Sequence, residues 1–434
     1  MKWWKVPVVL LGCAGGFGIG FFLRDVSAGR APSGAALAAF ATNGNKPTPT
    51  EVFQRNYDTI IRKYARSVDP TNLRYAAMQG AVSSLGDPHT SFLEPVVADR
   101  FAMETHGDFV GVGARLSDDP QGAKVAVVFK NSPASRAGLK VNDVIVQVDD
   151  NKVAGWDTDK IVKHVKGEAG TVVHLTIQRP GVAGLLKLQA TRAQVFIPTA
   201  EAKVLDGNIG YISVATFAEN TPGQFDDALQ ELMNKKTEGL VIDLRSNPGG
   251  LLNAASAMLG RFAESKQVVT MKLRGGHVVE EKSPAGSVWP VKGPVVILIN
   301  EESASASEIF ASDMRHWVKA KLVGEHTYGK MSVQTVHTIP QDMASLKVTI
   351  ARYFVPSGED YSRKVDDDGA FLKGGIVPDY PVELDYKPDT MIGDPAKDNQ
   401  LAKAIQVLKG NPTEPPPTAR LQARIERSDE AQAC

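Results

Sequence analysis

Apolar residues in the second half of the chain follow two spacings, one typical of buried strands and the other of helices. Val295–Ile299 is an uninterrupted apolar run, as expected for a strand buried on both faces. The apolar positions that follow it at helical spacing are Ile309, Phe310, Met314 and Trp317. Strand and helix patterns alternate in this way from Ile209 to about Val355, which predicts an α/β core.

Residues 110–179 have a different pattern, with shorter apolar runs close together. The runs VGVGA, KVAVVF, DVIVQVDD and VVHLTIQR are rich in strand-forming residues, whereas SPASRAGL and DTDKIVKHVKG have helical character. A stretch this small and self-contained predicts a separate domain inserted into the chain, which we place at residues 96–182. The α/β core is then expected at residues 183–410.

The segments on either side of these two regions differ in composition. Residues 50–95 are expected to form a helical region, because aromatic and aliphatic positions recur up to about residue 81, before the turn-rich segment SLGDPHTSFL. Residues 29–49 are rich in Ala, Gly, Ser and Pro and predict a flexible tether. Residues 411–434 are polar and proline-rich, which predicts a disordered tail.

Residues 1–28 have the features of an export signal or a membrane anchor. Lys2 and Lys5 precede an almost uninterrupted apolar run over residues 6–23, whose length is at the lower limit for a membrane-spanning helix. Three fates of this segment remain open: retention as an anchor, cleavage at the small residues 26–28, or lipidation of Cys13. Each of them places the body of the protein outside the cytoplasm, in a bacterial periplasm or cell envelope. A buried helix of a soluble protein is the alternative for this segment.

Composition and charge narrow the classes of function. The chain has 434 residues, of which 43% are hydrophobic and 23% charged, so it is expected to fold rather than remain disordered. Its 49 basic residues balance 49 acidic ones, and this gives no support for a nucleic-acid partner. The two cysteines, Cys13 and Cys434, lie outside the predicted domains, and the histidines show no metal-ligand spacing. We therefore expect no metal and no cofactor.

The run SASASE, residues 303–308, lies between the apolar strand and the amphipathic helix and contains the first candidate for chemistry. A serine at a helix N-terminus can act as a nucleophile, because the free N–H groups and partial positive charge there stabilise a developing oxyanion. Serine at this position can also simply cap the helix through its hydroxyl. The segment alone leaves both interpretations open.

A serine nucleophile needs a base, and Lys330 in GEHTYGKMSVQ is the candidate, since the chain has no GxSxG motif. Lysine ordinarily titrates at about pH 10.4, so a base active near neutrality needs its pKa lowered by about three units. We therefore expect Lys330 to be buried, with Glu308 and Glu325 pointing away from it. Gln334 lies four residues further on, on the same face of a strand, where its amide oxygen can orient the amine. A solvated lysine in a Gly-rich turn is the alternative.

Backbone donors for an oxyanion are available in two segments. The sequence Pro248-Gly249-Gly250 predicts a sharp turn at the end of a strand, where glycine lets backbone N–H groups approach a reacting carbonyl. Ala306 offers its N–H next to Ser305. A PGG turn without any such role is the alternative for the first segment.

Taken together, these segments resemble the C-terminal processing peptidases, or tail-specific proteases, a family of serine endopeptidases with a Ser/Lys dyad. The resemblance covers residues 50–410. It is carried, in order, by SLGDPHTSFL, GVGA, NSPASRAGLKVNDVIVQVDD, VIDLRSNPGGLL, SASASEIFA, VGEHTYGKMSVQ, VPSG and GGIVPDYPVEL. It implies an α/β spiral core, related in architecture to crotonase and the Clp protease subunits, with an inserted PDZ domain and an N-terminal helical region.

The same resemblance implies roles for individual residues. Ser305 would be the nucleophile, Lys330 the general base and Gln334 the residue that orients it, whereas Ser303 and Ser307 would be structural. The oxyanion would be bound by the N–H of Ala306 and that of Gly249 or Gly250. In the PDZ domain, which binds a chain end as an added strand, the terminal carboxylate would be held by Val110, Gly111, Val112, Gly113 and Lys166.

Two positions depart from the pattern of the family. Lys330 is followed by Met331, where glycine is common in the family. This difference is expected to affect the geometry of the catalytic site. Lys166 stands where an arginine often helps to bind the carboxylate, and lysine lacks the two-pronged fork of arginine.

The sequence thus predicts an exported serine endopeptidase that recognises substrate C-termini. Its expected partners are polypeptides with free C-termini, and homo-oligomerisation and membrane association remain open. The alternatives are a catalytically impaired PDZ scaffold that delivers client proteins, for which Met331 is the argument, and a crotonase-like acyl-CoA enzyme.

Overall fold

The computed structural model describes residues 46–286, 293–387 and 390–410, which divide into two compact units, one ending at Ala77 and the other beginning at Met78. The predicted anchor, most of the tether and the predicted tail lie outside the described residues. Within them, no helix has the length and apolar character needed to cross a membrane.

The first unit contains the predicted N-terminal helices. Helix α3 (Pro49–Lys63) begins with a capping box, in which the Thr48 hydroxyl accepts from the Glu51 N–H and the Glu51 carboxylate accepts from the Thr48 N–H. None of its residues is buried. Helix α4 (Pro70–Ser83) follows and continues into the second unit.

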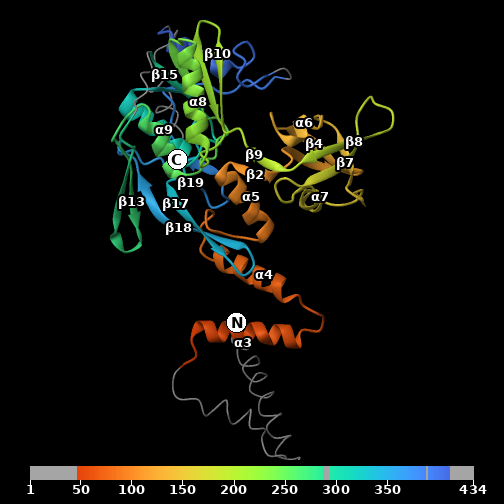
Figure 1. The fold of residues 1–434 in the computed structure, drawn as a ribbon. Coiled ribbons are helices and arrows are strands. Elements are labelled where there is room, and N and C mark those ends of the chain that lie inside the picture. Colours follow the sequence, from red (N-terminus) through yellow and green to blue (C-terminus); the bar gives the residue numbers. More distant parts are fainter. Residues whose placement is uncertain (1–45, 287–292, 388–389, 411–434) are drawn as a thin grey trace, which may run out of the picture. The chain divides into compact units, whose positions relative to one another are not determined.

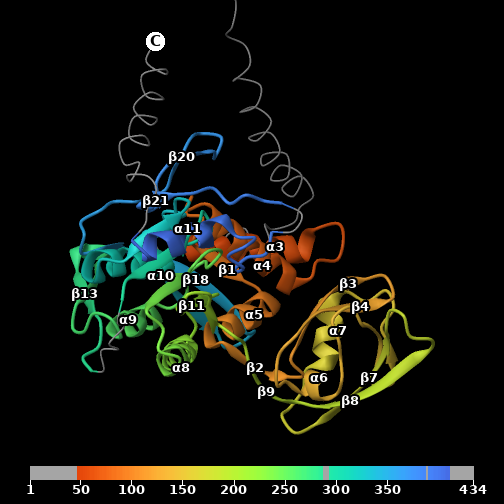
Figure 2. The ribbon, with the colours of Figure 1, turned by 90° about the horizontal axis from the view of Figure 1, so that it is seen from above.

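The α/β core of the second unit contains a six-stranded sheet in the order β10-β11-β12-β15-β16-β21. Only β10 is antiparallel to its neighbour. The strands are β10 (Ala200–Leu205), β11 (Ile209–Val214), β12 (Gly239–Asp243), β15 (Val295–Ile299), β16 (Lys321–Gly324) and β21 (Tyr380–Pro381). The helices of this region are α8 (Thr221–Asn234), α9 (Leu252–Gly260), α10 (Ala306–Asp313) and α11 (Asn399–Leu408) (Figures 1 and 2).

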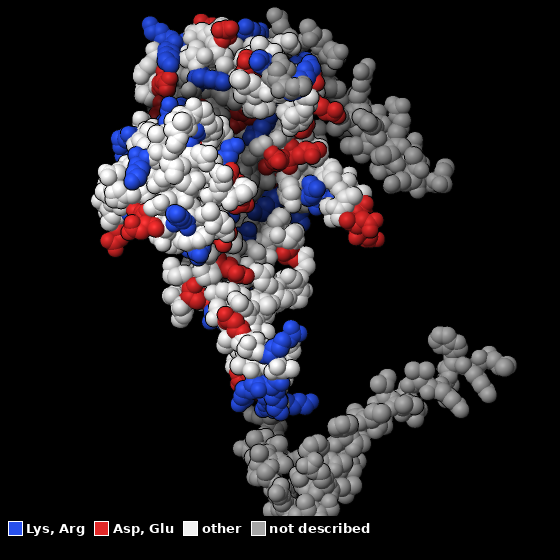
Figure 3. Space-filling view, turned by 90° about the vertical axis from the view of Figure 1, so that its right-hand side faces the viewer, with Lys and Arg blue, Asp and Glu red and all other residues white. Residues whose placement is uncertain are grey.

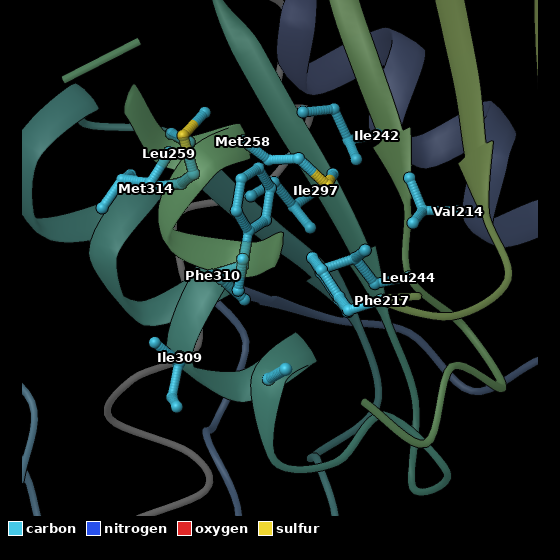
Figure 4. Close-up of a cluster of buried hydrophobic side chains, with 14 of the residues drawn as sticks. Val214, Phe217, Ile242, Leu244, Met258, Leu259, Ile297, Ile309, Phe310 and Met314 are labelled. Carbon is cyan, nitrogen blue, oxygen red and sulfur yellow. The ribbon is translucent and has the colours of Figure 1, made fainter. Parts of the chain in front are cut away.

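Strand β15 shows why the parallel strands have continuous apolar sequences. Its residues Val295, Ile297 and Ile299 belong to the core cluster that includes α8, α9 and α10, whereas Val296 and Leu298 belong to the cluster that includes α11. A strand covered on both faces must be apolar at every position. In the first cluster, Phe310 of α10 points toward Met258 and Ile297 (Figure 4). This packing holds the N-terminus of α10 at the carboxyl end of β15.

A second, antiparallel sheet carries the segment that follows Lys330. Its strands are β1 (Ser91–Leu93), β13 (Gln267–Leu273), β14 (Val278–Lys282), β17 (Ser332–Ile339) and β18 (Ala344–Phe354). Strand β18 pairs with β1, β13 and β17. Strands β1 and β17 pair with the same part of β18 from its two sides, so β18 lies between the segment SLGDPHTSFL and the strand that follows Lys330.

The predicted inserted domain is a six-stranded antiparallel sheet with its own apolar core. The strands are β3 (Ala114–Asp119), β4 (Gly122–Val128), β5 (Val144–Val148), β6 (Asn151–Lys152), β7 (Val172–Gln178) and β8 (Leu185–Thr191). The helices are α6 (Pro133–Arg136) and α7 (Thr158–Val165), and α7 lies against β3 and β4 (Figure 2). Because β8 pairs along β7, the sheet extends beyond the boundary expected at residue 182.

The remaining elements lie outside these three sheets. They are helix α5 (Pro95–His106), strands β2 (Asp108–Gly111) and β9 (Ala193–Phe196), which pair with each other, the π-helical turn η2 (Met314–Val318), the 3-10 turn η1 (Arg274–Gly276), and strands β19 (Lys364–Val365) and β20 (Phe371–Lys373). Acidic and basic side chains are interspersed over much of the face shown in Figure 3, consistent with the balanced composition.

Candidate active site

Ser305 lies between β15 and α10 in a backbone conformation that is rare for any residue other than glycine. Its φ is 55° and its ψ is −114°. Such conformations cost about 1–3 kcal/mol and persist only where the surroundings impose them, typically at functional sites. Here the Ser305 N–H donates to Glu308 Oε2 at 2.7 Å. Of the three serines in the SASASE run, only Ser305 has this strained backbone conformation.

The two flanking serines are fully buried and hydrogen-bonded to backbone. Ser303 Oγ donates to the Leu244 carbonyl at 2.8 Å, and Ser307 Oγ donates to the Asn247 carbonyl at 2.9 Å. Ser305, by contrast, is partly exposed. This arrangement agrees with the structural roles expected for Ser303 and Ser307.

Glu308, in the first turn of α10, connects the serine to the lysine segment. Its buried carboxylate accepts from four donors. Oε1 accepts from the Thr327 hydroxyl at 2.5 Å and the Gly329 N–H at 2.6 Å, and Oε2 accepts from the Ser305 N–H and the Lys330 N–H at 2.9 Å. Burial raises the pKa of Glu308 to about 7, and the hydrogen bonds oppose that rise. One carboxylate therefore holds the backbones of both candidate catalytic residues.

Lys330 is only partly exposed, and its pKa lies below the ordinary value for lysine. Burial is the largest cause and the positive charge of Lys347 the next, while Glu308 and Asp87 act in the opposite direction. The expectation that Glu308 points away from Lys330 was wrong, because the carboxylate binds the Lys330 N–H. Glu325 does face elsewhere, accepting from the Leu384 N–H at 2.8 Å.

Met331, the departure from the family pattern, packs into the core. Its side chain is 5% exposed and belongs to the cluster beneath α10. Ser362 Oγ lies 3.4 Å from its sulfur. The buried Tyr353 hydroxyl donates to the Lys330 carbonyl at 2.5 Å, so the backbone at this position is supported from the same side. The fold thus accommodates methionine next to Lys330.

Gln334 lies on β17 opposite Thr349 of β18. Its side-chain Nε2 donates to Ser332 Oγ at 2.9 Å and to Thr349 Oγ1 at 3.1 Å. Both protons of the amide are therefore used, and the amide oxygen is the end left to accept a hydrogen bond from elsewhere.

The PGG turn lies directly against the serine segment. A side chain at Gly249 would meet Ala304, Ala306 and Ser305 at 2.6–2.9 Å, so only glycine fits there. The Gly249 N–H already donates to Asn247 Oδ1 at 2.9 Å, which leaves the Gly250 N–H as the better candidate of the two glycines. Ala306 is the first residue of α10, where a helical N–H has no intrahelical acceptor.

The fully buried Asn247 was not singled out from the sequence, although it precedes the PGG turn. Its Nδ2 donates to the Val214 carbonyl at 2.8 Å, and its own carbonyl accepts from the Ala304 N–H at 3.1 Å. Together with its contact to Gly249, these bonds join β11, the PGG turn and the serine segment. In the sequence, an asparagine before a turn does not by itself indicate that its side chain joins distant segments.

Asp87 and His89 of SLGDPHTSFL were also missed as neighbours of Lys330. The ring of His89 lies 6.2 Å from that of Tyr328, centre to centre. Burial lowers the pKa of His89, and the nearby charge of Lys330 adds to this effect. The sequence of this segment predicts a turn and no more, because nothing local indicates that it lies next to residues far along the chain.

The inserted domain contains an apolar pocket between β3 and α7. Its lining includes Gly111, Val112, Gly113, Leu116, Val162, Val165 and Lys166. Strand β3 is at the edge of its sheet and so has a free side on which a peptide can add as a strand. Val110 does not line the pocket, although Phe109 and Gly111 on either side of it in β2 do, because successive residues of a strand face opposite sides.

Lys166 is engaged by a carboxylate of the chain itself. Its Nζ lies 2.7 Å from Asp99 Oδ2 of α5 and 3.3 Å from the sulfur of Met103. A ligand carboxylate at this lysine must therefore compete with Asp99.

Comparison with known proteins gives matches over both folded regions. Residues 208–382 match the model of peptidase family S41, and residues 124–179 match a PDZ domain model. Carboxy-terminal processing protease CtpB of Bacillus subtilis is 32% identical over 356 residues, which are 80% of this chain and 72% of that protein. Carboxy-terminal processing protease CtpA of the same organism is 31% identical over 364 residues, 81% of this chain and 75% of that protein.

A solved structure from Bacteroides fragilis assigned to the S41 proteases superposes with a TM-score of 0.50. It covers 85% of this chain and 99% of its own, at 17% sequence identity, and therefore supports the fold alone.

Proposed function

The chain belongs to peptidase family S41 and is a serine-type C-terminal processing protease with a PDZ domain; from this premise we propose that it cleaves polypeptides by a Ser305/Lys330 dyad. One observation carries the assignment of the dyad. The buried Glu308 carboxylate binds the backbone N–H groups of Ser305 and Lys330 at once, so the two segments have a fixed relation. Proximity held in this way is a large part of catalysis.

In the proposed first step, neutral Lys330 accepts the proton of the Ser305 hydroxyl as Oγ attacks the scissile carbonyl carbon. The N–H groups of Ala306 and Gly250 stabilise the oxyanion that forms. The lysine then gives the proton to the leaving amine, which releases the C-terminal fragment and leaves an ester at Ser305. Attack of water on this ester, with Lys330 again as base, restores the serine and releases the N-terminal fragment.

The lowered pKa of Lys330 supports its role as the base. A lysine must be neutral to accept a proton, and burial together with the charge of Lys347 favours the neutral form. Gln334 can accept a hydrogen bond from the lysine through its amide oxygen, since its amide protons are used by Ser332 and Thr349.

Substrate selection is proposed to occur at the PDZ pocket. The apolar side chains Leu116, Val162 and Val165 suit the last side chain of an extended peptide, and Lys166 together with the N–H groups at residues 111–113 suits its carboxylate. We propose that the enzyme acts outside the cytoplasm, because of the charged and apolar pattern of residues 1–23.

The test is turnover of an unfolded reporter polypeptide by the full-length protein and its variants. Ser305→Ala and Lys330→Ala are each expected to lower kcat by at least about a thousandfold, as for other activated serines. Lys364→Ala, at an exposed lysine, is the control for lysine removal. The reporter is compared with one whose C-terminus is amidated, which is expected to be cleaved more slowly.

Full activity in either dyad variant would show that the assignment is wrong. Absence of turnover by the wild-type protein, together with binding of the reporter, would instead favour the PDZ scaffold.

A further inference from the structure

We infer that Arg192 is a specificity-determining residue of the PDZ domain, because its buried guanidinium neutralises the negative end of α7, beside which a substrate carboxylate is proposed to bind. The inference deepens the proposed function and rests on it, since it takes the PDZ pocket as the site that receives a chain end. Arg192 lies between β8 and β9 and does not line the pocket itself. Its side chain instead contacts the last turn of α7.

The C-terminal end of α7 lies at the place where we propose that the carboxylate binds. Val162, Val165 and Lys166 of this end line the pocket. The last carbonyls of a helix have no intrahelical donor and give its C-terminus a partial negative charge. An anion beside Lys166 therefore meets an unfavourable potential unless a cation binds those carbonyls.

Arg192 supplies that cation through direct hydrogen bonds. Its Nε donates to the Val165 carbonyl at 2.8 Å, and its Nη2 donates to the His164 carbonyl at 3.2 Å. Nη1 donates to the Thr171 hydroxyl at 2.9 Å and to the Val172 carbonyl at 3.2 Å. Arg192 is 7% exposed, and none of these acceptors is charged. Because arginine keeps its charge in proteins, the contacts place a buried positive charge at the end of α7.

The loop that follows Lys166 is built around this guanidinium. A side chain at Gly167 would meet Nε and Cζ of Arg192 at 2.9 and 3.0 Å. The backbone of Arg192 binds the same loop, because its N–H donates to the Thr171 carbonyl and its carbonyl accepts from the Gly170 N–H, both at 2.8 Å. These contacts hold the loop and the end of α7 against one segment of chain.

The same segment adjoins the backbone donors proposed for the carboxylate. Ala193, the next residue, pairs with Gly111 in the β2–β9 ladder (Figure 1). Gly111 begins the stretch 111–113 whose N–H groups we propose for the carboxylate. Asp99 binds the ammonium group of Lys166, whereas the guanidinium of Arg192 binds uncharged acceptors. The charge of Arg192 therefore remains available to attract a ligand carboxylate.

The experiment compares two replacements that can each donate to a carbonyl but differ in charge. Arg192→Lys keeps the positive charge, and Arg192→Gln removes it. Fluorescence anisotropy measures binding of a short fluorescein-labelled peptide ending in valine to the full-length protein, in a Ser305→Ala background that prevents cleavage. The peptide is used with a free and with an amidated C-terminus.

Arg192→Gln is expected to weaken binding of the free-ended peptide about fivefold to thirtyfold, the size of a charge effect at a partly buried helix end. Binding of the amidated peptide should change by less than about twofold, because it has no carboxylate to respond to the charge. Arg192→Lys should lose at most about threefold with either peptide. Arg179→Gln is the matched control, since Arg179 binds Asp143 and the Gly138 carbonyl in the same domain. It should leave the preference for the free end unchanged.

Equal losses for the two peptides in Arg192→Gln would show that Arg192 only supports the fold, and would overturn the inference. Equal affinities of Arg192→Gln and Arg192→Lys for the free-ended peptide would overturn it as well. If urea unfolding shows that Arg192→Gln does not fold, Gly167→Ala decides, because its added methyl group displaces the guanidinium and should weaken only the free-ended peptide.

The Ser305→Ala protein without a change at Arg192 tests the premise separately. Equal binding of the free and amidated peptides by that protein would contradict the proposed PDZ pocket and remove this inference with it. A clear preference for the free end that Arg192→Gln retains would leave the pocket intact and overturn only the role of Arg192.

Discussion

At Glu308, four hydrogen-bond donors converge on one carboxylate that has no access to solvent. All four contacts are hydrogen-bond donors, so they favour the ionised carboxylate, although burial raises the pKa of Glu308. Its position three residues after Ser305 resembles an ordinary helix capping box. What distinguishes it is that the same oxygens also bind the Thr327–Lys330 segment.

Glu308→Gln is expected to lower kcat about tenfold to a hundredfold and to reduce the unfolding free energy by about 2 kcal/mol. The amide nitrogen of glutamine would face two of the four donors and leave them without an acceptor. Turnover of the reporter and urea unfolding measure the two effects. Glu325→Gln is the matched control, because Glu325 binds Leu384 and Gln400 away from the site. Equal losses in the two variants would contradict the role of Glu308.

Asp313, at the end of α10, is a buried carboxyl whose two oxygens have no hydrogen-bond partner among the described residues. Burial raises its pKa to about 9. The folded protein thus keeps a proton that the unfolded chain releases near pH 4, so the unfolding free energy falls as pH rises from about 4 to 9. The penalty reaches at most about 7 kcal/mol at pH 9.

Asp313→Asn is therefore expected to raise the unfolding free energy at pH 8 relative to wild type, with little difference at pH 4. Urea unfolding at the two pH values measures this. Glu308, whose pKa is also raised, contributes in the same direction in both proteins and cancels in the comparison. Ser312→Ala removes a neighbouring unpartnered hydroxyl and should have the same effect at both pH values. A pH-independent effect of Asp313→Asn would contradict the argument.

At the scale of elements, α5 and the loop after α7 are joined by the ion pair of Asp99 and Lys166. In this pair, Asp99 binds the ammonium group of Lys166 that we propose for binding a substrate carboxylate. Exposed ion pairs contribute only about 0–1 kcal/mol, so the pair can be displaced. It will nevertheless reduce the affinity for the ligand, because displacement of Asp99 has a free-energy cost.

Asp99→Asn is expected to tighten binding of a short peptide with an apolar, free C-terminus by about twofold to fivefold. Fluorescence anisotropy on the Ser305→Ala background, which prevents cleavage, measures the affinity. The same peptide with an amidated end should not gain. Asp159→Asn, which breaks the neighbouring pair with Arg100, is the matched control. An equal gain for both peptides would rule out competition at Lys166.

At the scale of the whole molecule, Arg245 joins segments that are distant in sequence. It lies just after β12, and its side chain is 4% exposed. It binds Asp243 at 2.6 Å and Asp398, the N-cap of α11, at 2.7 Å, and Nη1 donates to Gln400 Oε1 at 2.9 Å. The end of the described chain is thereby fixed to the core sheet near the PGG turn.

Arg245→Met is expected to reduce the unfolding free energy by about 3–5 kcal/mol, because it leaves two buried carboxylates without their cation. Urea unfolding at pH 7 measures this. Arg261→Met, which breaks a more exposed pair with Asp226, should have an effect of at most about 1 kcal/mol. A loss no larger than that of the control would mean that water replaces the guanidinium at this site.

Much of this protein could be predicted from local pattern, for physical reasons that differ between regions. The continuous apolar run at β15 reflects burial on both faces, and the apolar spacing after SASASE predicted the helix α10, so both elements and the α/β class followed from the sequence. That every residue of α10 is buried, including its polar ones, did not follow from this spacing. The matched S41 and PDZ regions confirm the family and the fold class. The roles of Ser305, Lys330 and Gln334 stay predictions until variants are assayed.

What the sequence alone determined, then, is the kind of protein and the candidate serine, because burial and turn chemistry are encoded locally. SASASE by itself was compatible with an ordinary helix cap. Only the tertiary structure could show that Ser305 has a strained backbone, that Glu308 reaches the Lys330 segment, and that Thr90 binds the backbone of Thr349. These relations depend on strand pairing between distant segments, which local spacing does not specify.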